Sequence, residues 1–334
     1  MDWSKGYSAS YYIKVVDPVT WRDTSRIEIT GGSIKRVTSG LMQSADLDCI
    51  DYPQDIEQWI RIYLDARQGD SGAHVPLFTG LAVSPDRDVR AQKSAMTVQC
   101  FSVLKPAADV ALLRGWYAQA GSNGASVIQE LLSVCPAPIT VAPNSPQLSS
   151  TIIAEAGETR LSMAEKVLEA IGWHTVINGN GEISVEPYDT TTKAVLDSMD
   201  YDVLETSLKV SCDWFSIPNV LMATSDELTA IARDDSPESK LSTVNRGREI
   251  WAVETDCNYS DTETLAEYAV RRLNELQRKV TEVSYTRRYI DGIYPLDVIG
   301  IYYPGQGLNA TYIIESQSIS LGHNARTSET VMEV

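Results

Sequence analysis

The sequence predicts a β-rich α+β protein in which two strand-rich regions flank a smaller mixed region. Short apolar runs that alternate with period two dominate residues 1–104 and 189–334, whereas residues 105–188 carry helical spacing. The chain has 334 residues, of which 43% are hydrophobic and 22% are charged. This length and composition predict two or three globular domains, because a single core rarely grows beyond about 250 residues.

The first region, residues 1–104, is expected to consist of short strands separated by turns. The sequence GDSG at 69–72 is a turn signal, and Met96, Val98 and Cys100 share one face of the last strand. Such a series is typical of a β-barrel or a β-sandwich. The predicted strands cover residues 11–16, 26–37, 47–50, 59–64, 77–83 and 96–103.

The middle region, residues 105–188, is predicted to be a small α+β domain. Helices are expected at 126–134 and 157–172, the second with Thr159 as N-cap and Gly172 at its end. Asn178-Gly179 and Asn180-Gly181 are turn signals that predict a β-hairpin within residues 173–188. Gly121 to Ser126 is glycine-rich but lacks the GK[ST] ending of a phosphate-binding loop, so it is interpreted as a helix entry.

The last region, residues 189–334, returns to strands and contains one long helix. Residues 189–201 are interpreted as a connector and 232–247 as a loop, because both are polar. The helix is expected to begin after Asp261 and to end near residue 280, with Leu265, Ala269, Leu273 and Leu276 on its apolar side. Strands are predicted at 204–214, 219–224, 250–255, 281–289, 297–303 and 311–321. The outline indicates a duplicated β-domain around an insert, although the sequence shows no repeat.

Charge and cysteine content restrict the classes of function. The formal charge is −17, from 45 acidic and 28 basic residues, whereas a protein that binds nucleic acid needs a basic surface. An acidic wall would instead repel DNA that passes by. No signal peptide and no membrane span are expected. Free thiols in a reducing cytosol are predicted for the five scattered cysteines, Cys49, Cys100, Cys135, Cys212 and Cys257.

No catalytic, cofactor-binding or metal-binding residue is predicted. His74, His174 and His323 do not have metal-ligand spacing, and no nucleophile elbow or Walker loop is present. Acidic pairs could in principle serve a glycosidase, and Asp234, Asp235 and Glu238 could bind calcium without the EF-hand spacing. A solvated face is the favoured interpretation of the pairs Asp46/Asp48, Asp234/Asp235 and Glu254/Asp256, and the first and last of these have strand spacing.

A basic cluster is predicted near the long helix and the strand that follows it. Phosphate binding and ion pairing with acidic groups of a neighbouring subunit are the two interpretations, and the second is favoured. The cluster comprises Arg271, Arg272, Arg278, Arg287 and Arg288.

Several segments resemble the baseplate hub proteins of contractile phage tails and the N-terminal region of tail-associated proteins of non-contractile tails. The resemblance extends over roughly the whole chain and rests on fold patterns rather than catalytic signatures. It is carried by GETRLSMAEKVLEAIGWHTVINGNGEISVEPY at 157–188, IPNVLMATSDE at 217–227, VNRGREIWAVE at 244–254, DTETLAEYAVRRLNELQ at 261–277, YPLDVIGIYYPG at 294–305 and TYIIESQSISLG at 311–322.

The resemblance implies two tube-like β-barrel domains, 1–104 and 189–334, flanking an inserted α+β domain, 105–188. It implies a non-enzymatic virion protein whose homotrimer forms a pseudo-sixfold ring. As a symmetry adapter, the ring would join the sixfold tail tube or distal tail ring proteins to a threefold spike or tip protein. The resemblance also implies contact with the tape measure protein, a channel through which DNA passes without specific binding, and assembly in the cytoplasm of the bacterial host.

Two other classes of function stay open from the sequence. One is a cell-wall hydrolase of the tail tip that uses two of the carboxylates, and the other is a β-rich carbohydrate-binding module. Neither a catalytic constellation nor an aromatic sugar platform stands out in the sequence, which favours the structural hub.

Overall fold

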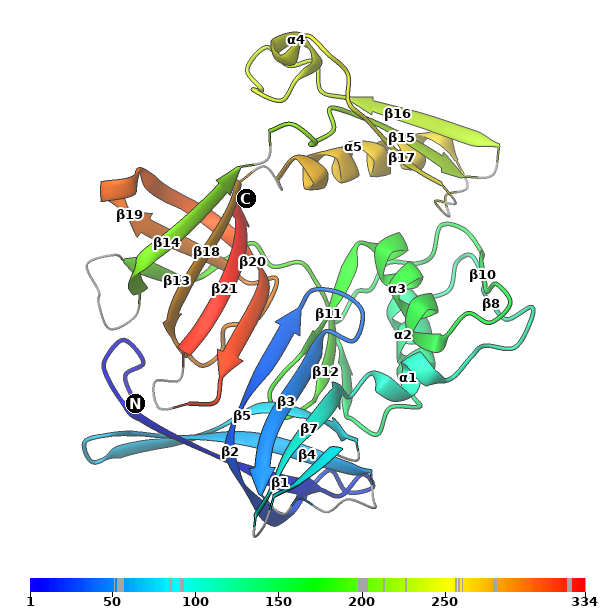
Figure 1. Ribbon diagram of the computed structural model, residues 1–334. Coiled ribbons are helices and arrows are strands. Elements are labelled where there is room, and N and C mark those ends of the chain that lie inside the picture. Colours follow the sequence, from blue (N-terminus) through cyan, green and yellow to red (C-terminus); the bar gives the residue numbers. More distant parts are fainter. Residues whose placement is uncertain are drawn as a thin grey trace.

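The computed structural model describes residues 1–50, 52, 57–83, 86–90, 93–197, 204–212, 214–225, 227–255, 257, 259, 261–278, 281–322 and 326–333. Strands dominate these residues, so the β-rich class predicted from the sequence is confirmed. Figure 1 shows one large sheet, a helical group beside it, and a helix-backed small sheet above both.

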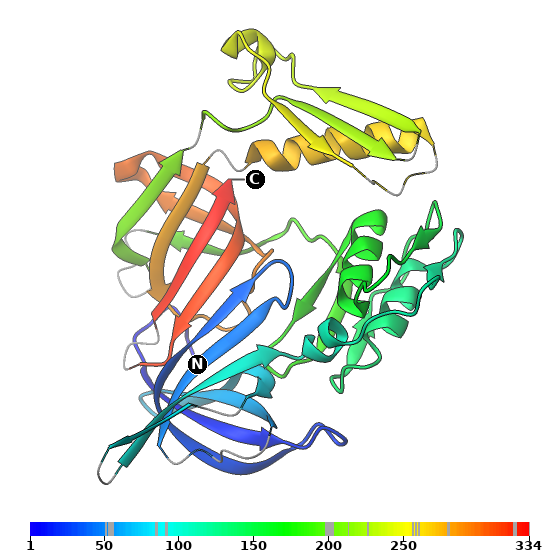
Figure 2. The same cartoon turned by 45° about the vertical axis from the view of Figure 1, so that its right-hand side comes forward.

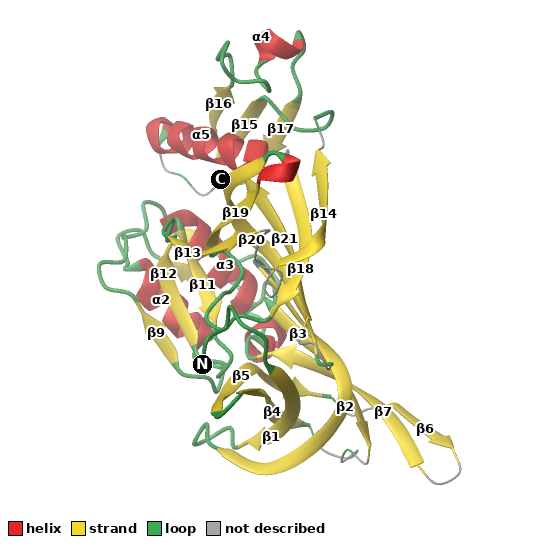
Figure 3. Ribbon diagram, turned by 90° about the vertical axis from the view of Figure 1, so that its left-hand side faces the viewer, coloured by secondary structure: helices red, strands yellow, loops and turns green. Residues whose placement is uncertain are grey.

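The first β unit is a ring of antiparallel strands. The strand order is β1-β4-β5-β7-β3-β2, and β1 also pairs with β2, which closes the ring around an apolar core. The predicted strands are confirmed, and β6 was not predicted. Figure 3 shows β6 and the start of β7 projecting from the rest of the sheet. The strands are β1 (Ser8–Val16), β2 (Asp23–Val37), β3 (Gln43–Ile50), β4 (Gln58–Gln68), β5 (Ser71–Ala82), β6 (Asp86–Arg90) and β7 (Lys93–Ser102).

The middle unit packs helices α2 and α3 together beside small sheets (Figure 2). The Thr159 side chain accepts from the Ser162 amide at 3.1 Å, and Gly172 ends α3 with φ 66°, so both predicted caps are confirmed. The predicted hairpin is β11 paired with β12. The elements are α1 (Lys105–Asp109), β8 (Tyr117–Ala118), α2 (Gly124–Leu132), β9 (Ile139–Val141), β10 (Ile152–Ile153), α3 (Arg160–Ile171), β11 (Trp173–Ile177) and β12 (Ile183–Pro187).

The turn of the β11–β12 hairpin docks on the first β unit through backbone carbonyls. The Thr79 hydroxyl donates to the Gly179 carbonyl at 2.8 Å, and Arg61 and Trp21 each donate to the Asn180 carbonyl at 3.0 Å. A Cβ atom on Gly179 would lie only 1.7 Å from the Pro76 carbonyl oxygen. The close approach of two backbones therefore requires glycine at this position.

Replacing Gly179 by alanine is expected to destabilise the protein by about 1–3 kcal/mol, because one backbone must move to admit the methyl group. Denaturant unfolding measures the loss. Gly305→Ala is the matched control, since nothing lies within 4 Å of its added Cβ. Equal stability of the two variants would contradict the close docking of the hairpin.

The second β unit is the strand order β14-β18-β21-β20-β19-β13. Strand β2 pairs with β20, so the two β-rich regions are in direct contact, as predicted. The interpretation of residues 189–201 as a connector was wrong, because β13 pairs in parallel with β19. The strand lacks a clear alternation of apolar and polar residues, because Val195 is exposed and only Leu196 is fully buried. The elements are β13 (Thr192–Asp197), β14 (Leu204–Cys212), β18 (Thr281–Arg288), β19 (Val298–Tyr303), η1 (Pro304–Gln306), β20 (Leu308–Ser320) and β21 (Arg326–Glu333).

A small helix-backed unit lies between β14 and β18 in the sequence. Its sheet has the order β16-β15-β17, and α5 packs on one face around a separate core. The Asp261 carboxylate accepts from the Thr264 amide at 2.9 Å, which confirms the predicted start of the helix. The predicted loop at 232–247 contains the short helix α4, which Ser242 caps. The elements are β15 (Val220–Ser225), β16 (Leu228–Arg233), α4 (Thr243–Arg246), β17 (Trp251–Glu254) and α5 (Thr262–Arg278).

Candidate functional site

One solvent-facing side of the continuous sheet is lined by short hydroxyl side chains. The strand registers place Ser318 beside Lys35 and Ser328, and Ser328 beside Thr286. The Thr286 and Ser328 hydroxyls lie 3.1 Å apart, which confirms that they share one side. We call this surface the hydroxyl face; it comprises Ser33, Ser44, Ser284, Thr286, Ser316, Ser318, Ser320, Ser328 and Thr330.

Charges border the hydroxyl face in both signs. Asp46 and Asp48 are exposed on β3, on the same side as Ser44, so the predicted solvated strand face is confirmed for this pair. Lys35 lies between Ser44 and Ser318, and Lys209 lies beside Ser284. Arg288 and Arg326 continue this side of β18 and β21 beyond Thr286 and Ser328, and Glu282 lies on the same side of β18. Because carboxylates as well as cations border the neutral hydroxyls, the face is not uniformly positive.

A buried polar network lies behind the hydroxyl face and spans both β units. Arg36 on β2 donates to the Gln317 side chain at 2.7 Å and also to the Leu77 carbonyl on β5. Gln317 donates to Glu329 at 2.7 Å, and Glu329 forms an ion pair with Arg287 on β18. The network therefore connects β5, β2, β20, β21 and β18 in one chain of contacts.

Glu329 is the centre of this network. Its two carboxylate oxygens accept from Arg287, from Gln317 and from the Tyr285 hydroxyl at 2.6 Å, and the Glu329 and Arg287 side chains are both 0% exposed. Burial raises the pKa of the Tyr285 hydroxyl well above its usual value, so Tyr285 donates its proton at neutral pH. The hydrogen bonds that these donors make to Glu329 offset the free-energy cost of burying the Glu329 and Arg287 charges.

The predicted basic cluster is not a single surface. Arg287 lies in the core of the second β unit, whereas Arg272 on α5 pairs with Glu254 at 2.7 Å and Glu275 at 3.0 Å. Arg271 lies 3.9 Å from Glu275 and beside the Tyr268 ring. Three of the five arginines thus pair with acids of their own chain, and the structure does not bring the five together to bind phosphate.

Sequence reasoning missed Arg36 and Glu329 and misplaced Arg287. A signal for Arg287 was present, because it continues the alternation of Val283 and Tyr285 that points into the core. A charged residue in a buried alternating series predicts a buried partner. The partner Glu329 lies in β21, a strand that the sequence did not predict.

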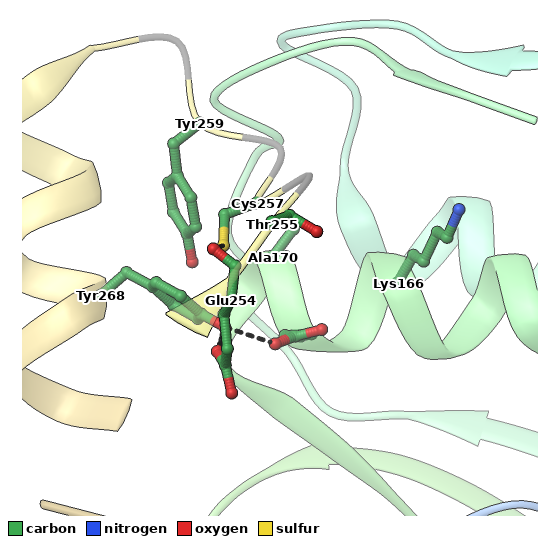
Figure 4. A pocket seen from close by; sticks show the side chains of 8 residues that line it. Lys166, Ala170, Glu254, Thr255, Cys257, Tyr259 and Tyr268 are labelled. Carbon is green, nitrogen blue, oxygen red and sulfur yellow. Dashed lines mark hydrogen bonds between the residues drawn. The ribbon is translucent and has the colours of Figure 1, made fainter. Parts of the chain in front are cut away.

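Figure 4 shows a pocket where α3 of the middle unit meets the small unit. The Tyr268 hydroxyl lies 3.0 Å from a Glu169 oxygen and 2.5 Å from a Glu254 oxygen. Burial and the neighbouring carboxylates raise the pKa of Tyr268 well above its usual value. Glu254 is therefore engaged by Tyr268 and Arg272 and is not part of a solvated strand face, whereas its predicted partner Asp256 lies outside the described residues.

The remaining candidates are dispersed. His74 is exposed on β5, 3.5 Å from Asp65, and His323 lies outside the described residues. His174 is buried against Tyr188, and burial lowers the pKa of its imidazole to about 4, so it is neutral at pH 7. Asp234 accepts from Ser239 at 2.5 Å and from Gln277 at 3.1 Å within its own loop and helix.

Within the described ranges, no three His, Cys, Asp or Glu side chains gather closely enough to hold a metal ion. No helix in the described part of the chain has the length and apolar character needed to cross a membrane. The five cysteines are free thiols, and Cys49, Cys100, Cys135 and Cys257 are buried.

Comparison with known proteins identifies the fold. No protein-family profile matches the chain, and no curated protein matches it in sequence. Among solved structures, a tail protein from Neisseria meningitidis superimposes with a TM-score of 0.74 at 16% identity, over 98% of this chain and 97% of that one. The prophage MuSo2 43 kDa tail protein from Shewanella oneidensis gives 0.72 at 12% identity, over 97% and 98%.

A third similar structure comes from a secretion system. It is an Escherichia coli component of the type VI secretion system, described as structurally similar to the T4 bacteriophage tail proteins gp27 and gp5. It superimposes with a TM-score of 0.51 at 9% identity, over 92% of this chain and 74% of that one. The chain therefore has the fold of phage tail proteins, as the resemblance in the sequence indicated.

Proposed function

We propose that the chain is a structural, non-enzymatic hub subunit of a phage-type tail baseplate. It acts as a homotrimer whose pseudo-sixfold ring encloses a channel and joins the hexameric tail tube to a threefold tip or spike. The observation that carries the proposal is the hydroxyl face, which extends over strands of both β units. The fold shared with phage tail proteins supports it.

We infer that each subunit contributes two tube-like β units, the second of which carries the small helix-backed unit between β14 and β18. We assign them to residues 1–104 and 189–334, with 105–188 as the inserted α+β domain. The β2–β20 pairing fixes the two units side by side, so one subunit contributes a double-width wall. Three such walls give six units around one axis, and a closed ring leaves no unpaired subunit surface along that axis.

A wall of short neutral hydroxyls suits a conduit. Phosphates gain affinity from each lysine or arginine contact, so a lumen that lets DNA pass should offer few unpaired cations. The hydroxyl face supports this requirement, because the acids Asp46, Asp48 and Glu282 accompany its cations, which are Lys35, Lys209, Arg288 and Arg326. The partners in this role are the tail tube or distal tail ring, the spike or tip protein, and the tape measure protein, within the virion.

The carboxylates in Figure 4 are poorly placed for a tail-tip hydrolase. A glycosidase needs a free acid and a free base or nucleophile with substrate between them. Here the Tyr268 hydroxyl occupies the space between Glu169 and Glu254, and Arg272 holds Glu254. These contacts favour a role in joining the middle unit to the small unit.

Light scattering of the purified chain tests the proposal. A trimer of about 110 kDa is expected, three times the 36.8 kDa of one chain. Cryo-electron microscopy of the trimer should then place the hydroxyl face on the inner wall. A stable monomer, or a trimer whose hydroxyl face points outward, would refute the channel assignment.

A further inference from the structure

A groove of about 1010 Å³ lies between α5 of the small unit and the second β unit. Figures 1 and 2 show α5 lying across the end of the sheet near the C-terminus. The groove is formed by the side of α5 that faces away from its own sheet, since Leu265, Ala269 and Leu273 cover that sheet. None of the residues that line it belongs to the hydroxyl face or to the network around Glu329.

Both walls of the groove carry apolar side chains. On α5, Ala266 and Val270 are exposed one turn apart, and Val270 is 54% exposed. The opposite wall consists of apolar side chains at the edge of the second β unit, Leu296, Val298, Ile313 and Met332. An apolar groove of this kind is the usual receptor for the apolar face of an amphipathic helix.

The rim of the groove is acidic. Among the described residues, no ion pair engages four of its glutamates, which are Glu263, Glu267, Glu315 and Glu333. The rim arginines Arg271 and Arg272 lie against Glu275 and Glu254. Arg278 is the remaining basic side chain of the lining, so the unpaired rim charge is negative.

We propose that this groove binds an amphipathic helical segment of another protein, with lysines or arginines flanking its apolar face. The apolar floor buries the segment's hydrophobic side chains, and the four glutamates pair with its flanking cations. The proposal does not depend on the hub assignment.

The test uses two designed helical peptides on the full-length chain. Both present the same leucine face, but one is flanked by lysines and the other by glutamates. Fluorescence anisotropy should give a Kd on the order of 1–100 μM for the lysine peptide, and at least about tenfold weaker binding for the glutamate peptide. Failure of the lysine peptide to bind in this range, or equal binding of both peptides, would overturn the proposal.

Substitutions inside and outside the groove test whether the lysine peptide binds there. Val270→Asp should raise the Kd of the lysine peptide by at least about tenfold. The double variant Glu267→Lys/Glu315→Lys should raise it by a similar factor. Val253→Asp is the matched control, because Val253 is also 54% exposed but lies on β17 of the same unit, outside the groove lining. Melting curves check that each variant folds. If Val253→Asp weakens binding as much as Val270→Asp, or if Val270→Asp only changes the oligomeric state, the groove is not the site.

Discussion

Replacing Glu329 by glutamine is expected to lower the free energy of unfolding by about 3–5 kcal/mol, because it leaves the Arg287 charge buried without a counter-charge. Glutamine keeps the shape of the side chain, so the effect reports charge rather than a cavity. The substitution should also disturb the hydrogen bonds of Gln317, which donates to a Glu329 oxygen and accepts from Arg36. Denaturant unfolding followed by fluorescence measures the change.

Two further variants isolate the buried pair. Glu282→Gln lies on the exposed side of the same sheet and should change stability by less than about 0.5 kcal/mol. The double variant Arg287→Met with Glu329→Leu should regain much of the stability that Glu329→Gln loses, because no unpaired charge remains. A Glu329→Gln protein as stable as Glu282→Gln would show that the network does not hold the two β units together.

Lysines on the hydroxyl face are expected to convert a neutral wall into one that binds DNA. With Ser320→Lys and Ser328→Lys, a trimer would present six added cations around its axis. Each phosphate contact steepens the dependence of log affinity on log salt by about 0.9, so the slope should change by up to about 5. Binding of short duplex DNA, measured between low and moderate salt, gives this slope.

The control places the same charge elsewhere. Thr192→Lys with Thr229→Lys adds two lysines per chain at exposed positions on β13 and β16, away from the hydroxyl face. Its DNA affinity should stay close to that of the parent chain. In virions, both variants should assemble normally. The Ser320→Lys/Ser328→Lys variant should then eject DNA slowly, whereas the control should eject it at the parental rate. Equal DNA binding by both variants would mean that the hydroxyl face is not enclosed by the trimer.

Local signals predicted the elements whose ends are set by neighbouring residues. Thr159 and Gly172 predicted α3 because caps act within one helical turn, and Asp261 predicted α5 for the same reason. Strand β13 was missed because its sequence TKAVLD does not alternate clearly, since Val195 is exposed and Leu196 is buried. Strand β21, with the sequence RTSETVME, was missed because Thr327 and Glu329 are polar at inward positions.

The candidate site depends on contacts that no local pattern reports. The alternating serines of β20, Ser316, Ser318 and Ser320, are visible in the sequence, but their continuation across β2 joins residues roughly 280 positions apart. The polar network is equally remote, since Arg36 and Gln317 are separated by 281 positions. Sequence reasoning predicted a surface cluster for Arg287, because it had no means of placing Glu329 opposite it.

Strand β2 changes its neighbour along its length, pairing with β1 through its first half and with β20 through its second half. A pull along the strand direction would load the β2–β20 hydrogen bonds simultaneously in shear, rather than opening them one at a time. Torque applied to one β unit therefore passes to the other with little twist at the seam. The small unit meets the middle unit through the Tyr268–Glu169 hydrogen bond, whereas the double-width wall should turn as one stiff plate.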